Sequence, residues 1–418
     1  MTREEILAAA QAMEAECIAL RREFHEYPEL SGQEDRTISR ICQELRSVGI
    51  EPIEVEDGGV LAVIQGKAPG KTVLLRADVD ALPVQEDTCN LLREKVCVSK
   101  IDGVGHVCGH DCHAAMLVCA GKILATNRDF SGRVILMFER GEEGGRNLRY
   151  LIDYLQKNRW EIDGVWGMHL NSDIPTGKFA IRDGILMAGG LMYDITLIGK
   201  GGHGSRPDWA NNPIDCFNTI QSALNTIRMR AVDPNLAITF STCKISTAQR
   251  SNIIGDTLTF GGTVRYFDLE NAYRPFSSMM RRMIDNIAAA FDCQVTYNQF
   301  ECIAVPLINN SDCFHIAQNV LTDLFGAENV VSGPLKFGSE TFSYVMNFWP
   351  GMYLNLGIKN PALGSGSGHH TAKFDVDEAQ FKTGIAAHVG YSLAFLSHQG
   401  PITGFKSYDG NIWDLLKE

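Results

Sequence analysis

Three short apolar runs in this chain end at residues that carry chemistry. Residues 72–75 lead into an aspartate pair, residues 134–138 lead into a glutamate pair, and residues 165–168 end at His169. Apolar runs of this length, separated by helical patterns, are typical of buried strands in a mainly parallel sheet that helices cover. Open α/β sheets keep their sites at the carboxyl ends of the strands. The sequence therefore predicts an α/β fold, with a mainly parallel mixed sheet and a site at that edge.

The pattern changes at about residue 188, where apolar and polar residues begin to alternate at period two, as in half-buried strands. Four such segments and two helical patterns follow before residue 304. This arrangement predicts a small α+β insert with an antiparallel sheet and two helices. We therefore expect a catalytic domain in two parts, residues 1–187 and 304–418, and an inserted domain at residues 188–303.

Composition excludes several classes of function. The chain has 418 residues, too many for one ordinary core, and its formal net charge is −12, whereas nucleic acids and acidic membranes require a basic surface. The first residues open a helix without an apolar signal core, no apolar run is long enough to cross a bilayer, and the 12 Cys are scattered. We expect a cytoplasmic protein with reduced cysteines and with no nucleic-acid or membrane partner.

The segment from Gly105 to His113 is the densest group of potential metal ligands. Three His and two Cys fall within its nine positions, with Asp111 among them. Imidazole and thiolate suit zinc, copper, nickel and iron, and the neighbouring glycines free the backbone so that Cys108 and His110 can face one ion. A redox loop, a structural zinc site and chance are the alternatives, but structural zinc sites usually repeat Cys-x-x-Cys, which occurs nowhere here. The segment favours a metal site.

Further motifs follow in a fixed order along the chain. They are His25 with Pro28-Glu29, Arg76–Pro83, His106–Asp111, Glu142–Gly145, Gly202–Gly204, Gly262–Arg265, and His370 with Phe374. In this order they resemble the amidohydrolase branch of the aminoacylase/carboxypeptidase superfamily of dinuclear metallopeptidases. That branch includes hippurate hydrolases, indoleacetyl-amino-acid hydrolases and N-acetyl-diaminopimelate deacetylases. The resemblance spans nearly the whole chain and implies a zinc-peptidase-like catalytic domain with an inserted dimerisation domain.

The resemblance also implies a metal centre and a general base. Two divalent cations per subunit are expected, zinc or manganese first and nickel or cobalt next. The implied ligands are Cys108, His110, Glu143, His169 and His370. Glu142 matches the general base, and Asp78, Asp80 and Asp111 match supporting residues. His369 adjoins His370, but only His370 stands four positions before Phe374, as the family's ligand does.

Substrate contacts are implied in the inserted domain. His203 matches a residue that reaches the metal site from the neighbouring subunit of a homodimer and stabilises the tetrahedral oxyanion, which is a large catalytic contribution in many enzymes. Asn252 and Arg265 match residues that bind the substrate carboxylate, a task that suits a planar guanidinium. From the residues alone, His203 is equally a solvent-exposed loop residue and Arg265 a surface charge.

Four positions depart from the family's usual pattern. Arg140-Gly141 replaces Pro-Ala before the glutamate pair, Cys112 replaces a glycine, Thr371-Ala372 replaces Ser/Asn-Pro, and Asp208 replaces a frequent histidine. Arg140 can pair with a carboxylate, and Cys112 adds a second thiol close to the metals. None of these changes removes a ligand or the base, so they bear on the substrate more than on the reaction.

These observations predict a metal-dependent amidohydrolase that cleaves N-acyl amino acids or related small-molecule conjugates. Metal coordination lowers the pKa of water, and a carboxylate that does not bind metal can take its proton and return it to the leaving nitrogen. Two alternatives stay open at this stage. One is an amidase with Cys108 or Cys112 as nucleophile, activated by a nearby histidine. The other is a relative that binds metal or ligand without catalysis.

Overall fold

The chain is described here by a computed structural model that covers residues 1–144, 147–247 and 250–416. These residues form two compact units. The first consists of Met1–Leu186, Ile308–Pro334 and Tyr344–Ile412. The second consists of Met187–Leu307, Leu335–Ser343 and the segment from Trp413 onward.

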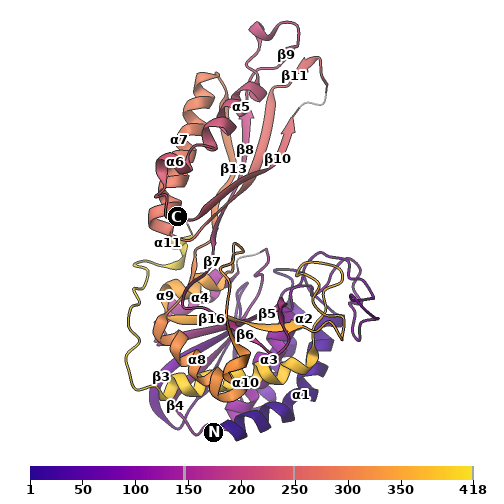
Figure 1. Cartoon of the computed structure of the whole chain (residues 1–418), viewed down its shortest axis with the longest axis vertical. Coiled ribbons are helices and arrows are strands. Elements are labelled where there is room, and N and C mark those ends of the chain that lie inside the picture. The colour runs from indigo at the N-terminus through magenta and orange to yellow at the C-terminus, as the bar shows by residue number, and fades with distance from the viewer. Residues whose placement is uncertain (145–146, 248–249, 417–418) are drawn as a thin grey trace. The chain divides into compact units, whose positions relative to one another are not determined.

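The first unit is built on an eight-stranded mixed sheet in the order β1-β2-β4-β3-β5-β16-β6-β15 (Figure 1). Its centre is parallel, because β3 pairs in parallel with both β4 and β5, and β5 pairs in parallel with β16. The strands are β1 (Pro52–Val55), β2 (Gly59–Gln65), β3 (Ala68–Asp78), β4 (Ser131–Glu139), β5 (Gly164–Pro175), β6 (Phe179–Ile181), β15 (Val330–Ser332) and β16 (Gly351–Lys359). The α/β fold class predicted from the apolar runs is confirmed.

Helices cover this sheet, and one of them lies almost wholly inside the unit. The helices are α1 (Arg3–Glu26), α2 (Asp35–Ser47), α3 (His110–Thr126), α4 (Leu148–Lys157), α8 (Ser311–Phe325), α9 (Phe342–Phe348), α10 (Phe381–Ser397) and α11 (Ile412–Leu415). Every residue of α3 from His110 to Ala125 is buried, because α1 and α10 pack against it. The first turn of α3 therefore presents its polar side chains to a site shielded from water.

The second unit is an antiparallel sheet of four strands in the order β10-β12-β8-β13, with α5 and α7 along one face (Figure 1). Its strands are β8 (Gly189–Ile198), β10 (Ile238–Thr247), β12 (Thr257–Tyr266) and β13 (Gln294–Ala304), and its longer helices are α5 (Pro213–Leu224) and α7 (Arg274–Ala290). Two short strands, β9 (Gly202–His203) and β11 (Ile253–Ile254), pair with each other. The period-two alternation predicted this sheet correctly.

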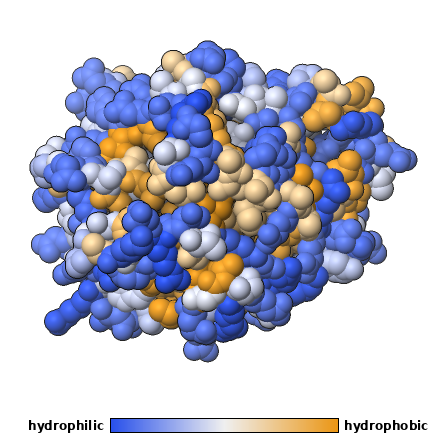
Figure 2. Space-filling view, turned by 90° about the horizontal axis from the view of Figure 1, so that it is seen from below, coloured by the Kyte–Doolittle hydropathy of each residue, from blue (hydrophilic) through white to orange (hydrophobic). Residues whose placement is uncertain are grey.

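One face of the molecule is mainly hydrophilic, with hydrophobic residues gathered in smaller patches between the polar ones (Figure 2). Within the ranges that the structure describes, no helix has the length and apolarity needed to cross a membrane.

Candidate metal centre

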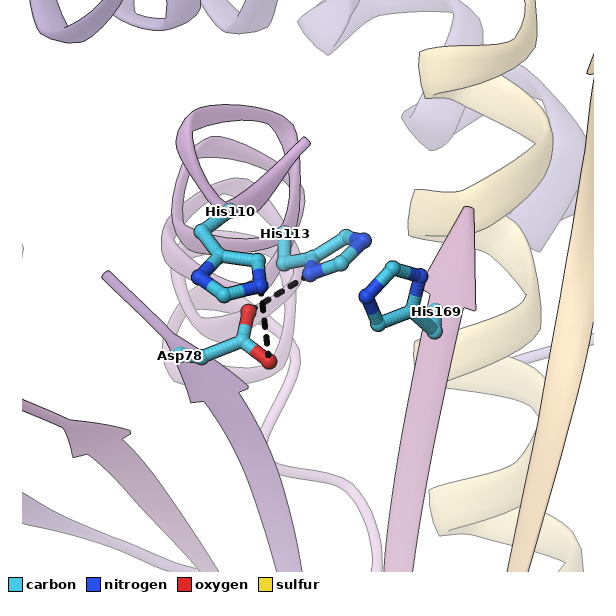
Figure 3. A group of neighbouring side chains, drawn as sticks. All are labelled: Asp78, His110, His113 and His169. Atoms are coloured by element: carbon cyan, nitrogen blue, oxygen red, sulfur yellow. Dashed lines mark hydrogen bonds and ion pairs between the residues drawn. The ribbon is translucent and has the colours of Figure 1, made fainter. Parts of the chain in front are cut away.

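Asp78 is the last residue of β3, and its buried carboxylate contacts two segments that lie far apart in sequence (Figure 3). Oδ1 lies 2.6 Å from Nδ1 of His113, Oδ2 accepts a hydrogen bond from Nη1 of Arg76 at 2.7 Å, and Nε2 of His110 is 3.7 Å from Oδ2. Burial opposes ionisation of this group, but the charges of Arg76 and the histidines hold the pKa of Asp78 well below its usual value. Asp78 is therefore a fixed anion at the carboxyl edge of the sheet.

His113 supports this anion, and both of its ring nitrogens are engaged. Nδ1 faces Asp78, and Nε2 accepts the backbone N–H of Leu170 at 2.9 Å. A backbone N–H can only donate, so Nε2 carries no proton and Nδ1–H is the donor to Asp78. His113 is thus a positioning residue and not a metal ligand. The sequence analysis gave it no role, although its spacing of three from His110 places both on one helix face.

His110 begins α3, and Asp80 fixes the orientation of its ring. Gly109 has a φ of 96°, which lets the chain turn sharply into the helix. Nδ1 of His110 lies 3.0 Å from Oδ1 of Asp80, whose Oδ2 accepts the N–H of Glu143 at 2.9 Å and the hydroxyl of Ser31 at 2.6 Å. Among the described residues, the buried Nε2 of His110 has no hydrogen-bond partner. A carboxylate on one ring nitrogen and a bare second nitrogen is the arrangement of a metal-binding histidine.

A second group of potential ligands adjoins the first. Ligand atoms of Cys108, Glu143 and His370 all lie within 4.8 Å of one another, and Nε2 of His370 is 3.0 Å from Oε1 of Glu143. Nε2 of His169 is 3.5 Å from Sγ of Cys108, while its Nδ1 is 2.5 Å from the carbonyl oxygen of Leu170. The carbonyl requires a proton on Nδ1, which leaves Nε2 able to bind a cation.

Glu142 lies beside these groups. One of its carboxylate oxygens, a ring nitrogen of His110 and a carboxylate oxygen of Glu143 lie within 4.8 Å of one another. The contacts therefore link all five residues predicted as ligands and bring the predicted base next to them. The assignment of each as ligand or base remains a prediction.

The chemistry of these donor atoms fits divalent cations. Thiolate, imidazole and carboxylate together suit zinc and neighbouring metals. Two atoms bound tetrahedrally to one zinc ion, one sulfur and one nitrogen, lie about 3.5 Å apart, which is the 3.5 Å separation of Cys108 Sγ and His169 Nε2. Burial raises the pKa of the Cys108 thiol well above its usual value, so a bound cation is needed to hold the thiolate.

His369 also approaches the thiol of Cys108. Its Nδ1 is 3.8 Å from Sγ, and its Nε2 accepts the N–H of Ser172 at 3.3 Å. Because Nε2 is an acceptor, the proton of a neutral ring is on Nδ1 and faces the sulfur. This geometry makes His369 a hydrogen-bond donor to Cys108 and leaves His370 as the residue next to Glu143.

Asp111 and Cys112 point away from the ligand cluster. Asp111 Oδ2 accepts from Nε of Arg21 at 2.7 Å and lies 2.8 Å from Nδ1 of His25, and the thiol of Cys112 donates to Asp111 at 3.4 Å. The pKa of Cys112 is raised well above its usual value by burial and then by Asp111. The suggestion that Cys112 adds a thiol close to the metals therefore has no support in its contacts.

The network around Asp111 extends to the loop that carries His370. Nε2 of His25 is 2.9 Å from Oε1 of Glu86, which also accepts from Nζ of Lys95 at 2.8 Å. Lys95 in turn donates to the carbonyl of Ala372 at 2.9 Å. Buried charges thus fix the backbone two residues after His370.

The remaining predicted residues belong to the second unit. His203 is exposed, and its Nδ1 accepts the N–H of Ser205 at 3.1 Å, which places the ring proton on Nε2. Asn252 lies on the same loop pair, with its carbonyl accepting the N–H of Gly204 at 3.0 Å. Arg265 donates to the Ser339 hydroxyl at 2.8 Å, and burial lowers the pKa of its guanidinium. Their roles toward a substrate stay predictions.

A mixed α/β unit with a buried Cys, His and Glu cluster at the carboxyl edge of its sheet defines the class of metal-dependent hydrolases. The chain belongs to peptidase family M20/M25/M40, whose model matches residues 74–393. This finding confirms the resemblance read from the motifs, and the chain is an amidohydrolase-type enzyme of that family.

Individual relatives cover most of the chain. It is 36% identical over 386 residues to thermostable carboxypeptidase 1 of Saccharolobus solfataricus, covering 90% of this chain and 95% of the relative. It is 32% identical to IAA-amino acid hydrolase ILR1-like 2 of Arabidopsis thaliana, covering 93% of this chain and 88% of that protein. The crystal structure of the Bacillus subtilis YXEP protein, a dinuclear metal-binding peptidase of the M20 family, is 27% identical with a TM-score of 0.75, over 92% of this chain and 99% of that one.

Proposed function

We propose that this enzyme hydrolyses the amide bond of N-acyl amino acids or related conjugates, releasing a carboxylic acid and an amino acid. The observation that carries the proposal is the convergence of Cys108, His110, Glu143, His169 and His370 with Glu142 beside them. These residues come from four separate parts of the chain. The Arabidopsis relative, named an IAA-amino acid hydrolase, supports a conjugate of an amino acid as the substrate class.

The residues divide the chemistry between them. A pair of divalent cations, when bound, lowers the pKa of water and polarises the carbonyl of the scissile amide. We assign the five ligands to holding these cations, while Asp80 fixes the ring of His110 and the backbone of Glu143. Glu142 takes a proton from the attacking water and returns it to the leaving nitrogen. The buried side chains around it exclude competing water from the reaction.

Substrate binding falls to the second unit in this proposal. Arg265 and Asn252 bind the carboxylate of the amino acid, and the Nε2–H of His203 donates to the developing oxyanion from the neighbouring subunit of a homodimer. Zinc or manganese is the expected metal, with nickel or cobalt as substitutes, because a mixed sulfur, nitrogen and oxygen site follows both affinity and supply. A cytoplasmic location suits the free cysteines found among the described residues.

The test of this function has two steps. Purified enzyme is first screened against N-acetyl, N-benzoyl and longer N-acyl amino acids with added manganese, zinc or nickel, before and after chelation. Glu142→Gln is then compared with the wild type for metal content and turnover. We expect loss of activity on chelation, recovery on adding metal, and a Glu142→Gln variant that keeps its metal but loses nearly all turnover.

Two results would overturn the proposal. Activity that survives complete metal removal would indicate a cysteine nucleophile, which the raised pKa values of Cys108 and Cys112 disfavour. Bound metal with no hydrolysis of any acyl amino acid would indicate a binding protein instead of an enzyme of this specificity.

A further inference from the structure

The turn that carries Glu142 is held from both sides by carboxylates of other segments. On one side, the N–H of Gly141 donates to Oε1 of Glu34 at 2.8 Å. On the other, the N–H of Glu143 donates to Oδ2 of Asp80 at 2.9 Å. Gly141 has a φ of 65°, a conformation that other residues rarely adopt, so the turn depends on such contacts to keep its shape. Glu142 lies between the two anchored amides.

The two anchors connect to different parts of the protein. Asp80 also contacts Nδ1 of His110, so its anchor belongs to the metal centre. Glu34 instead accepts from Nε of Arg140 at 3.0 Å, and Arg140 also pairs with Asp35 through Nη2. The Glu34 side chain is 0% exposed and that of Arg140 is 13% exposed. Water therefore screens this ion pair little.

Arg140 keeps Glu34 in the form that holds the turn. A fully buried carboxylate is costly without a partner, and burial raises the pKa of Glu34 above its usual value. The guanidinium of Arg140 opposes this by stabilising the ionised form, and a charged acceptor binds the Gly141 N–H more strongly than a neutral one. Arg140 is itself the residue before Gly141, so the pair closes a short loop around the turn.

We propose that Arg140 and Glu34 form an ionic clamp that positions Glu142 for proton transfer. The proposal rests on Glu142 being the general base. It makes Arg140 and Glu34 positioning residues that act on catalysis and not on metal binding, whereas the Asp80 anchor serves metal binding. Small displacements of a catalytic group can cost up to about 100-fold in rate.

The experiment compares Arg140→Ala, Arg140→Lys and Glu34→Ala with a matched control in the metal-loaded enzyme. The control is Arg46→Ala, which removes another arginine of an α2 ion pair, 3.2 Å from Glu51 and exposed to solvent. For each variant, kcat, KM, metal content and Tm are measured. We expect kcat to fall about 10-fold in Arg140→Ala and up to about 100-fold in Glu34→Ala, with KM and metal content unchanged. Arg140→Lys should restore kcat to within about threefold of the wild type, and the control should match the wild type.

The outcomes separate a positioning role from a structural one. Loss of metal together with kcat, or a kcat equal to that of the wild type in folded Arg140→Ala, would overturn the clamp. If Glu34→Ala does not fold, Arg140→Ala decides alone, because Glu34 keeps its contact with Gly141 in that variant. Failure of the proposed function is distinguishable, since it would appear as full activity in Glu142→Gln whatever the clamp variants do.

Discussion

His110 and Asp111 are adjacent in sequence but belong to two buried polar networks that differ in how their charges are balanced. Around Asp111, the carboxylates of Asp111 and Glu86 are matched by cationic groups on Arg21 and Lys95. Around His110, the donor atoms of Cys108, Glu143 and His370 face one another instead. The first network is complete without a ligand, whereas the second is balanced only by added positive charge. The comparison distinguishes a structural network from a binding site.

The largest expected effect concerns the second network. Glu143→Ala should lower turnover at least about 1,000-fold and reduce metal content below two ions per subunit, because it removes a carboxylate that no other residue replaces. In the presence of chelator its Tm should equal that of the wild type, since the metal-free site loses only a repulsive charge. Metal analysis and thermal unfolding check both points. A large loss of stability in chelator would place Glu143 in a structural network.

Asp111→Ala should behave in the opposite way. It leaves the guanidinium of Arg21, 1% exposed, without its closest carboxylate. Breaking one side of a buried ion pair costs about 3–5 kcal/mol of the free energy of unfolding. Urea unfolding should show this loss equally with and without chelator, and Asp129→Ala, which removes an exposed partner of Lys67, should change stability by less than about 0.5 kcal/mol. A loss that appears only in the metal-loaded protein would mean that Asp111 acts through the metals.

Glu86 gives the first network a dependence on pH. Burial acts to raise its pKa, but His25 and Lys95 outweigh it and lower the pKa of Glu86 to about 2. A pKa lower in the folded than in the unfolded state stabilises above the unfolded value and loses that effect as pH falls toward the folded value. Glu86→Gln should therefore destabilise the protein by about 2–3 kcal/mol at pH 7, and the difference should shrink between about pH 4.5 and 2. Urea unfolding across this range checks the trend, and a constant difference would contradict it.

Much of the site was predictable because strand ends are marked in the sequence. Asp78, Glu142 and His169 each follow an apolar run, and parallel strands bring such ends to one edge. The family resemblance then supplied Cys108 and His370, which lie in loops without a periodic pattern. The parallel centre of the sheet was predicted in the same way, while the extension of β3 back to Ala68 was not, because its first residues are polar or glycine.

Other features were not predictable because they depend on contacts between distant backbone atoms. His113 looks like a ligand by spacing, and only the N–H of Leu170 on its Nε2 excludes that role. Glu34 holds Gly141 across 107 positions of sequence. The segment Leu335–Ser343 joins the second unit although it follows a return to the first along the chain. No local pattern encodes such pairings.

The smallest predicted effect tests where the boundary of the metal centre lies. His113→Ala removes a hydrogen bond to Asp78 but no ligand, because Nε2 is engaged by Leu170 and Nδ1 by the carboxylate. Loss of such a supporting contact typically weakens metal binding by about 10- to 100-fold without changing the number of sites, and we expect the lower end because Arg76 still holds Asp78. Competition with a chromophoric chelator measures the affinity, with His315→Ala on the exposed face of α8 as control. Loss of one whole metal equivalent at saturating metal would instead make His113 a ligand and move it inside the cluster that cations complete.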